Sequence, residues 1–408
     1  MTPPERFFAT CPRGLETLLG EELAALGAVD LRVLGGGVAF AGDMKLAWRC
    51  NLWSRLATRI LVQVADGPYA REDDIYRLAR AVEWRDWFSV DKTLRVNVTA
   101  IKSPVKSIEF VTLRIKDAVC DVFRDACGER PNIDTREPDV RVHGFLTENR
   151  CTLYLDTSGA PLYQRGLRQK TVSAPLKENL AAGMLKLSGW QPGTSFFDPM
   201  CGSGTLLLEA VQVALNIAPG ARRSFAFENF ENFVPAAWKR IREEAVAGEK
   251  TPDSLSHGDS LRSQKNSPNA TWGIYGADID QVAYRAALAN LDRAGWLDAV
   301  HLSCGDITAL TVAPAAQGVM LSNPPYGVRL SELDELAGFY PELGRVMKQV
   351  FAGWNCYFLS ADTRLPKLLG LKPSKKTPLF NGDLDCRLYE IKMVAGSNRR
   401  EKPAQLAQ

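Results

Sequence analysis

The alternation of hydrophobic and polar positions over the first 158 residues predicts two successive α+β modules. In the segment 108–126, apolar residues recur at steps of three and four positions, which is typical of a helix with one buried face. Strands are expected at residues 7–10, 31–33, 38–40, 59–65, 94–101, 141–146 and 151–155, and helices at 14–26, 73–84 and 108–126. The last two of these strands are expected to form a hairpin around Glu148-Asn149.

From residue 175 onward, strands alternate with helices, which predicts a Rossmann-like α/β sheet. A helix over 175–187 has Pro175 in its first turn, where proline is favoured. The strands at 377–380 and 387–394 turn at Asn381-Gly382 and are expected to close the fold as an antiparallel hairpin. Between these ends we expect a strand, turn and helix within 196–210, strands within 272–278, 300–307 and 318–322, and a helix over 281–293.

The most informative segment is Asn323-Pro324-Pro325-Tyr326-Gly327, which follows the apolar run at 318–322. Two consecutive prolines cannot extend a sheet or enter a helix interior, so the strand must end here. Asn323 is then expected at the carboxyl end of a strand, where open α/β sheets bind ligands. Its side-chain oxygen and the Pro324 carbonyl can both accept from an exocyclic NH2 group, and Tyr326 offers a ring for stacking. Alone, the segment is equally compatible with a proline-rich turn.

A second segment, Asp198-Pro199-Met200-Cys201-Gly202-Ser203-Gly204-Thr205, links a strand to a helix. Gly202 and Gly204 let the backbone approach a ligand, and the free N–H groups of the new helix favour an anion. The spacing does not fit the dinucleotide fingerprint, and no phosphate-loop lysine is present. A carboxylate, such as the amino-acid end of a cofactor, is therefore favoured over a pyrophosphate, and Asp198 is placed to meet an ammonium group.

Two further strands end in acids, each followed by an isoleucine. Asp278 and Ile279 end the strand within 272–278, and Asp306 and Ile307 end the strand within 300–307. Asp278 is suited to ribose hydroxyls, and Asp306 to an adenine amine with Ile307 against the ring. Each acid alone is more often a helix N-cap. Four such segments in order nevertheless predict one ligand-binding edge.

These four segments, in this order, resemble those of class I S-adenosylmethionine (SAM)-dependent methyltransferases, in the branch that modifies exocyclic amino groups. Residues 162–168 and 174–182 resemble the junction found in THUMP-domain RNA methyltransferases, and residues 7–16 are similar to the start of the same proteins. The similarity runs from about residue 5 to about 395 and is strongest to the bacterial 23S rRNA guanine-N2 methyltransferases. It implies an α/β, Rossmann-like class I methyltransferase domain preceded by α+β ferredoxin-like and THUMP domains.

The resemblance also sets expected domain limits. They are 1–58 for the ferredoxin-like segment, 59–158 for the RNA-binding THUMP domain, 159–174 for a linker, 175–395 for the methyltransferase domain with an insertion at 219–270, and 396–408 for a mobile tail. The insertion holds five aromatic residues, Phe225, Phe227, Phe230, Phe233 and Trp238, which we expect to pack their own segment onto the core rather than to meet RNA bases.

The implied activity is methyl transfer from SAM to the N2 amine of a guanine in 23S rRNA. Asn323, Pro324 and Tyr326 are the implied catalytic residues. The implied cofactor-binding residues are Asp198, Pro199, Cys201, Gly202, Gly204, Thr205, Asp278, Ile279, Asp306, Ile307 and Asn323. Some relatives carry a second methyltransferase at the carboxyl end; this chain stops at Gln408 and is expected to carry one activity. A tRNA guanine-N2 methyltransferase, a DNA adenine-N6 methyltransferase and a non-catalytic ribosome-assembly factor remain as alternatives.

Composition agrees with this interpretation without deciding it. The 408 residues are 46% hydrophobic and 24% charged, with no apolar stretch of eighteen residues and no signal peptide, so we expect a cytoplasmic protein without membrane contact. Nine cysteines without a Cys-x-x-Cys pair and only three histidines predict no metal site and no disulfide framework. Cys201 has no histidine nearby in sequence to activate it, so a packing role is expected.

The net charge of +3 is too small to indicate nucleic-acid binding, so the distribution of charge matters more. Residues 92–116 hold six basic residues against one acid, and residues 362–376 hold five against one. Such runs are usually solvated surfaces, but the family resemblance favours RNA contact for the first. The predicted RNA-binding residues are Lys102, Lys106, Arg114, Lys116, Arg165 and Arg168.

Overall fold

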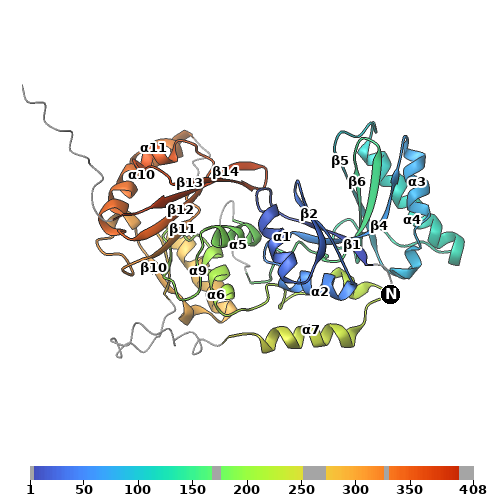
Figure 1. The fold of residues 1–408 in the computed structure, drawn as a ribbon, viewed down its shortest axis with the longest axis horizontal. Helices are drawn as coiled ribbons and strands as arrows, with labels where there is room; N and C mark the ends of the chain where they lie inside the picture. Colours follow the sequence, from blue (N-terminus) through green and yellow to red (C-terminus); the bar gives the residue numbers. More distant parts are fainter. Residues whose placement is uncertain (1–3, 168–175, 251–272, 326–329, 395–408) are drawn as a thin grey trace, which may run out of the picture. The chain divides into compact units, whose positions relative to one another are not determined.

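The computed structural model describes residues 4–167, 176–250, 273–325 and 330–394. It divides into two compact units. Figure 1 shows the fold, with colours that follow the sequence. The first unit comprises residues 1–183, 208–257 and 379–384, and the second comprises residues 184–207, 258–378 and 385–408. No helix in the described part of the chain is long and apolar enough to cross a membrane.

The first unit is built on one seven-stranded sheet with the order β2-β3-β1-β4-β7-β6-β5. Neighbouring strands run antiparallel except β5 and β6, which are parallel. Because β1 pairs with β4, the predicted ferredoxin-like and THUMP segments share this sheet, with Phe7 opposite Val62. The strands are β1 (Glu5–Thr10), β2 (Val29–Leu34), β3 (Gly37–Gly42), β4 (Arg59–Pro68), β5 (Leu94–Ala100), β6 (Val140–Leu146) and β7 (Arg150–Asp156). The predicted hairpin of the last two strands is confirmed.

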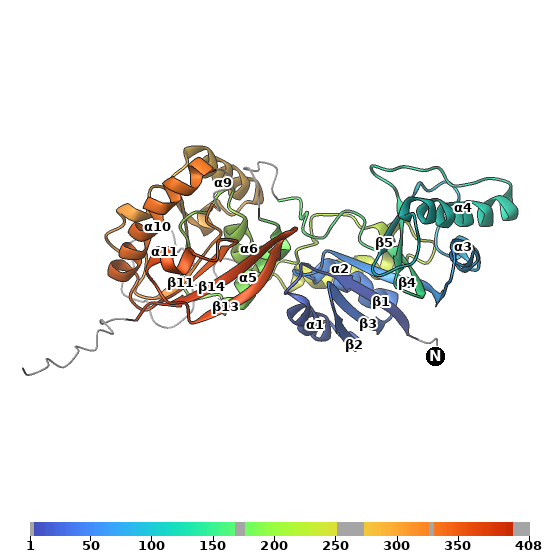
Figure 2. The same ribbon diagram turned by 90° about the horizontal axis from the view of Figure 1, so that it is seen from above.

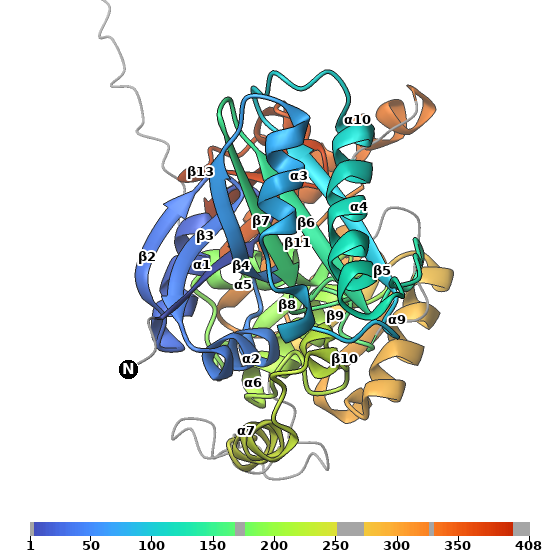
Figure 3. The same cartoon turned by 90° about the vertical axis from the view of Figure 1, so that its right-hand side faces the viewer.

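Two helices of this unit, α3 (Glu72–Arg80) and α4 (Ile108–Cys127), lie side by side in Figure 3. Polar contacts join them: the Arg114 guanidinium pairs with Asp73 at 2.8 Å, and the Tyr76 hydroxyl donates to Asp121 at 2.8 Å. The amphipathic pattern of residues 108–126 is confirmed, since the buried side chains of α4 follow its apolar positions. The remaining helices here are α1 (Glu16–Ala25), α2 (Met44–Trp53) and α7 (Pro235–Ala247).

Helix α2 was not predicted from the sequence. It begins after Asp43, whose side chain accepts from the Leu46 N–H at 2.7 Å as an N-cap. Its Trp48 stacks on Phe227 and meets Phe233 edge-on, each at a centroid distance of 5.5 Å. The Phe227 ring is in turn 5.0 Å from that of Trp238. The aromatic residues of the insertion therefore pack within the first unit, which confirms the packing role expected for them.

The second unit contains the other seven-stranded sheet, with the order β10-β9-β8-β11-β12-β14-β13. The first five strands in this order are parallel, and β14 runs antiparallel to β12, so the Rossmann-like expectation is confirmed. The final hairpin turns at Gly382, whose φ of 66° suits glycine. The strands are β8 (Phe196–Asp198), β9 (Ile274–Asp278), β10 (His301–Cys304), β11 (Gly318–Ser322), β12 (Trp354–Ser360), β13 (Lys375–Asn381) and β14 (Leu384–Lys392).

Helices cover both faces of this sheet, and they can be followed in Figure 2. On one face, Leu343 and Leu365 join a core with Phe197 and Met320. On the other face, Gly276 leaves room for Leu207, since an added Cβ would lie 2.5 Å from that side chain. The helices are α9 (Gln281–Ala294), α10 (Leu330–Val350) and α11 (Leu365–Leu369), together with α5 (Glu178–Leu187) and α6 (Thr205–Ala214), whose residues are divided between the two units.

Candidate active site at the strand ends

The order of the parallel strands brings the predicted polar residues to one edge of the second sheet. The chain leaves β8 for β9 and then β10 on one side, and β11 pairs with β8 on the other side. The strand order thus reverses between β8 and β11, and open α/β sheets bind ligands at such a switch point, outside the carboxyl ends of the strands. Asp198 ends β8, and Asn323 follows β11, so these two residues flank the switch point.

Asp198 is buried, with 2% of its surface exposed, and its partners are neutral groups. The Ser322 hydroxyl donates to one carboxylate oxygen at 2.7 Å, and the Met200 N–H donates to the same oxygen at 3.3 Å. Burial raises the pKa of Asp198 to about 7, and the nearby Asp278 carboxylate adds to this rise. A cationic group supplied by a ligand would stabilise the ionised form, so this residue fits the ammonium of an amino-acid moiety.

Asp278 connects the end of β9 to the turn that follows β8. It accepts from the Gly202 N–H at 2.8 Å and from the Asp280 N–H at 2.9 Å. Gly202 and Gly204 have φ values of 55° and 83°, which favour glycine. An added Cβ on Gly204 would also lie 3.3 Å from the Ala287 side chain. The turn therefore keeps the backbone close to the sheet edge at the start of α6, where N–H groups can meet a carboxylate.

Three other predicted cofactor-binding residues lie in the same turn or at its end. Pro199 follows β8, Cys201 is buried beside the carboxylates, and Thr205 is the first residue of α6. The Cys201 N–H donates to the Ala277 carbonyl at 2.9 Å. Burial raises the pKa of the Cys201 thiol above its ordinary value, which keeps the thiol protonated and agrees with a packing role.

The two isoleucines next to the other acids differ in exposure. Ile279 is 67% exposed, whereas Ile307 is 3% exposed and packs in the core with Met320 and Tyr340. The expectation that the Ile307 side chain lies against an adenine ring is therefore wrong, because that side chain is occupied by the core. Asp306 accepts from the Thr308 N–H at 2.8 Å and caps a short 3₁₀ turn.

The Asn-Pro-Pro turn is described as far as Pro325. Asn323 is half-buried and Pro324 is buried directly after the end of β11. The Tyr340 hydroxyl, which lies on α10, donates to the Pro325 carbonyl at 3.0 Å. Sequence reasoning missed Tyr340, because it lies fifteen residues after Pro325 in a helix without a recognisable motif. Tyr326 lies outside the described residues.

The predicted RNA-binding residues do not share one environment. Lys102 and Lys106 are exposed in the loop between β5 and α4. Arg114 and Lys116 are partly exposed and pair with Asp73 and Asp117. Arg168 lies outside the described residues.

The RNA-contact prediction for Arg165 is wrong. Its side chain is 1% exposed and forms an ion pair with Glu209 at 3.1 Å, and it also donates to the Arg55 carbonyl at 2.8 Å. A guanidinium in this position is part of the packing of the first unit and is not accessible to RNA.

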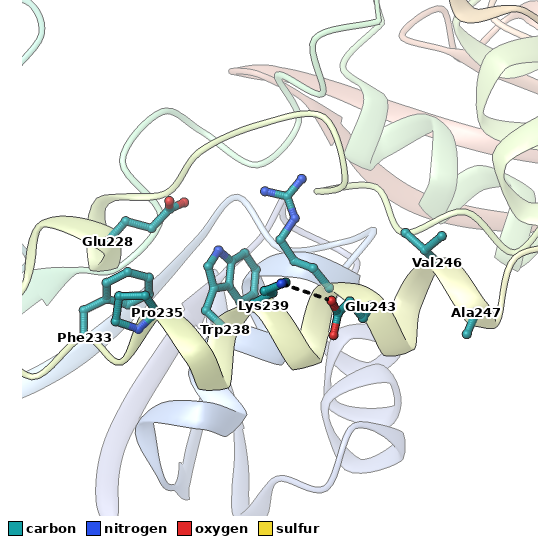
Figure 4. A pocket seen from close by; sticks show the side chains of 9 residues that line it. Glu228, Phe233, Pro235, Trp238, Lys239, Glu243, Val246 and Ala247 are labelled. Carbon is teal, nitrogen blue, oxygen red and sulfur yellow. Dashed lines mark ion pairs between the residues drawn. The ribbon is translucent and has the colours of Figure 1, made fainter.

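A groove of about 700 Å³ lies along α7 in the first unit (Figure 4). It is lined by residues between Glu228 and Ala247, among them Trp238 and the ion pair of Lys239 with Glu243. None of the predicted site residues contributes to this lining.

The parallel sheet, the switch point and the donor set at its edge define a class of protein: a class I methyltransferase that uses SAM. The residues fit this cofactor, because Asp198 suits its ammonium, the N-terminal end of α6 that follows the glycine turn suits its carboxylate, and Asp278 suits its ribose hydroxyls. The exposed Ile279 beside Asp278 offers an apolar surface for the adenine.

The domain comparisons give the family. The RMKL-like methyltransferase domain matches residues 165–390, the THUMP domain residues 69–156, and the RlmL ferredoxin-like domain residues 6–61. The first of these matches covers more than half of the chain, and the chain belongs to the RMKL-like methyltransferase family. The expected order of the three domains is thereby confirmed.

Three curated proteins illustrate the relationship. The ribosomal RNA large subunit methyltransferase K/L of Cellvibrio japonicus is 40% identical over 392 residues, covering 94% of this chain and 50% of that protein. The protein of the same name from Shewanella frigidimarina is 37% identical over 399 residues, covering 97% of this chain and 54% of that protein. The chain thus spans about half the length of both. A Synechocystis sp. protein named as a candidate RNA methyltransferase, slr0064, is 36% identical over 391 residues, covering 95% of this chain and 96% of that protein.

Solved structures support the fold and the cofactor. The crystal structure of SMU.472 complexed with SAH, the product left when SAM has lost its methyl group, is 28% identical with a TM-score of 0.84, covering 97% of this chain and 100% of that chain. TrmN from Thermus thermophilus shares the fold at 21% identity with a TM-score of 0.68, covering 96% of this chain and 100% of that chain.

Proposed function

We propose that this protein transfers a methyl group from SAM to the exocyclic N2 amine of a guanine in 23S rRNA. The observation that carries the proposal is the Asn323–Pro324 turn at the switch point, beside the acids and glycines suited to SAM. Two relatives named as ribosomal RNA large subunit methyltransferases, and the THUMP match at residues 69–156, support RNA as the substrate.

The chemistry of the turn suits this substrate. A guanine amine is a poor nucleophile, because its lone pair is delocalised into the ring. SAM supplies an electrophilic methyl group when bound. The side-chain oxygen of Asn323 and the carbonyl of Pro324 can accept the two N–H bonds of the amine, which turns the lone pair toward the methyl carbon and stabilises positive charge as it develops. Tyr326 would hold the base by stacking. The methylated amine is acidic enough to lose its proton to water.

The first unit would hold the RNA. The target base must leave its stack, or come from an unpaired loop, to reach a pocket at a sheet edge. Lys102 and Lys106 are exposed and can neutralise phosphates, whereas Arg114 and Lys116 are already paired with acids. We expect the two exposed loop lysines to contribute more to RNA binding than the two paired residues.

The activity is tested with Asn323→Ala. Removing one preorganised hydrogen-bond group at a transition state typically lowers turnover by roughly 10² to 10³-fold, so we expect that loss with SAM affinity retained. Asn355→Ala, an exposed asparagine on the neighbouring strand β12, is the matched control and should leave turnover unchanged. Equal turnover in the two variants would remove the catalytic assignment of Asn323.

The substrate is tested by mass spectrometry of nucleosides. RNA from cells that lack the protein is treated with the purified enzyme and SAM, and 23S rRNA and tRNA are digested separately. N2-methylguanine that appears in 23S rRNA supports the proposal. Methylation confined to tRNA, or to adenine, would overturn it.

The RNA-binding role is tested with Lys102→Ala combined with Lys106→Ala. Two lost phosphate contacts should weaken RNA binding and reduce the slope of log affinity against log salt by about 2. Lys45→Ala, an exposed lysine of the same unit, is the control. An unchanged salt slope would contradict the role of the two loop lysines.

A further inference from the structure

The Asn-Pro-Pro turn is held at both of its ends by hydroxyl groups. At the start, the Ser322 hydroxyl donates to buried Asp198 at 2.7 Å. At the far end, the Tyr340 hydroxyl donates to the Pro325 carbonyl at 3.0 Å. Between them, Pro324 and Pro325 have no N–H group and a fixed φ angle, so the turn has few free dihedral angles left.

The Tyr340 ring is itself firmly placed. It is 2% exposed and belongs to a core cluster that includes Ile307, Met320 and Leu343. Burial raises the pKa of Tyr340 to about 12, and the Asp362 carboxylate adds to this rise. The hydroxyl therefore keeps its proton and remains a donor at every pH at which the enzyme works.

These contacts have a consequence for the reaction. The direction of the Pro325 carbonyl depends on the ψ angle of Pro325, which is the last free dihedral angle of the two prolines. When Tyr340 holds that carbonyl and Ser322 holds the start, the backbone that carries the Pro324 carbonyl and the Asn323 side chain is restricted to one preferred conformation. Small errors in the placement of such groups are costly in catalysis, because acceptors must meet the amine without reorganising.

We propose that Tyr340 is a positioning residue for methyl transfer, whose hydrogen bond to Pro325 aims the acceptors of the Asn323–Pro324 turn at the target amine. The proposal rests on the function proposed above for this turn. It assigns to Tyr340 no contact with the substrate or with SAM.

The test is Tyr340→Phe, which removes the hydroxyl and keeps the ring in the core. We expect the rate constant kcat to fall about 10- to 100-fold, equivalent to about 1.4 to 2.7 kcal/mol of transition-state stabilisation. The Kd for SAM, measured by calorimetry, should stay within twofold, because the substitution removes a hydrogen bond to Pro325 and keeps the ring in the core cluster. Tyr357→Phe is the matched control: Tyr357 is buried on β12, its pKa is raised to about 12 by burial and by Glu390, and its loss should leave kcat unchanged.

A double-mutant cycle with Asn323→Ala separates positioning from a merely structural role. If Tyr340 acts through the turn, its effect on kcat should largely disappear in the Asn323→Ala background, so that the two losses are not additive. Wild-type kcat in Tyr340→Phe, or fully additive losses, would overturn the proposal.

The assay counts methyl groups transferred from labelled SAM to total RNA, whichever base receives them. If the base is not guanine, or the RNA is not 23S rRNA, the proposed substrate fails while the kcat comparison still decides the role of Tyr340. If the substrate is as proposed and kcat is unchanged, the role of Tyr340 fails alone.

Discussion

Each of the two units buries a carboxylate, and the partners of the two carboxylates differ in charge. In the first unit, Glu209 pairs with Arg165, and both side chains are 1% exposed. Arg55 extends the same network by donating to the Ile217 carbonyl at 2.7 Å. In the second unit, Asp198 is equally buried, but it is held by a hydroxyl and a backbone N–H, and its pKa is raised to about 7.

The difference separates a structural ion pair from a residue for which we predict a role in ligand binding. Removing a charge from water costs several kcal/mol, and an oppositely charged partner offsets part of that cost. Glu209 has such a partner within the protein, the Arg165 guanidinium at 3.1 Å. Asp198 has only neutral donors, so the stabilisation of its charged form is left to a cationic group that arrives with a ligand. Burial alone would have placed the two acids in one category, and the identity of their partners distinguishes them.

The largest expected effect comes from breaking the pair in the first unit. Glu209→Gln leaves the Arg165 guanidinium buried without a counter-charge, and we expect a loss of about 3 to 5 kcal/mol in the free energy of unfolding, measured by denaturant titration. Glu243→Gln serves as the control: its pair with Lys239 is exposed, and its loss should cost less than about 1 kcal/mol. Similar losses in the two variants would contradict the structural role of the buried pair.

In the second unit, we expect the loss of the buried carboxylate to weaken ligand binding and not to lower the free energy of unfolding. Asp198→Asn should weaken SAM binding by about 100-fold, in line with the roughly 2 to 5 kcal/mol that a lost buried charge partner costs. The ligand-free protein at pH 8 should lose no stability, because the variant removes a charge that burial disfavours. Calorimetry with SAM checks the first point, with Asp292→Asn on the exposed side of α9 as control. A destabilised variant with normal SAM affinity would make Asp198 a structural residue.

The pH dependence of the free energy of unfolding also distinguishes Asp198 from a paired carboxylate. The folded pKa of Asp198, about 7, lies above the ordinary value of 3.8, so the folded state binds this proton more tightly than the unfolded state does. The contribution of Asp198 to the free energy of unfolding is fully present below about pH 4 and decreases as the pH rises toward 7. We expect a loss of about 2 to 3 kcal/mol between pH 5 and 8 in the ligand-free protein, and Asp198→Asn should remove it. Parallel stability curves for the two proteins would refute this.

The smallest effect is expected at Asp278, which is less buried than Asp198 and for which we predict contacts with neutral ribose hydroxyls. Asp278→Ala should weaken SAM binding by about tenfold, or about 1.4 kcal/mol, as expected for hydrogen bonds to a charged acceptor. The Kd for SAM measured by calorimetry decides the point. An unchanged Kd would exclude the ribose role.

The strand-end residues could be predicted because each one follows a short apolar run, and parallel strands bring their carboxyl ends together. Helix α2 could not be predicted, because Trp48, Cys50 and Asn51 are all buried and leave no one-sided apolar stripe. The sequence also cannot tell a buried arginine from an exposed one, which is why Arg165 was assigned wrongly. The contact from Tyr340 to Pro325 depends on how α10 returns to the sheet, which no local pattern encodes.

The pairing of β1 with β4 has a practical consequence for anyone who divides this protein. The border between the ferredoxin-like and THUMP matches runs through a hydrogen-bonded sheet. Separating the domains there would expose two unpaired edge strands, which favour aggregation. Exchange of either domain between relatives would meet the same obstacle. The ferredoxin-like and THUMP domains are therefore best expressed, or exchanged between relatives, as a single unit.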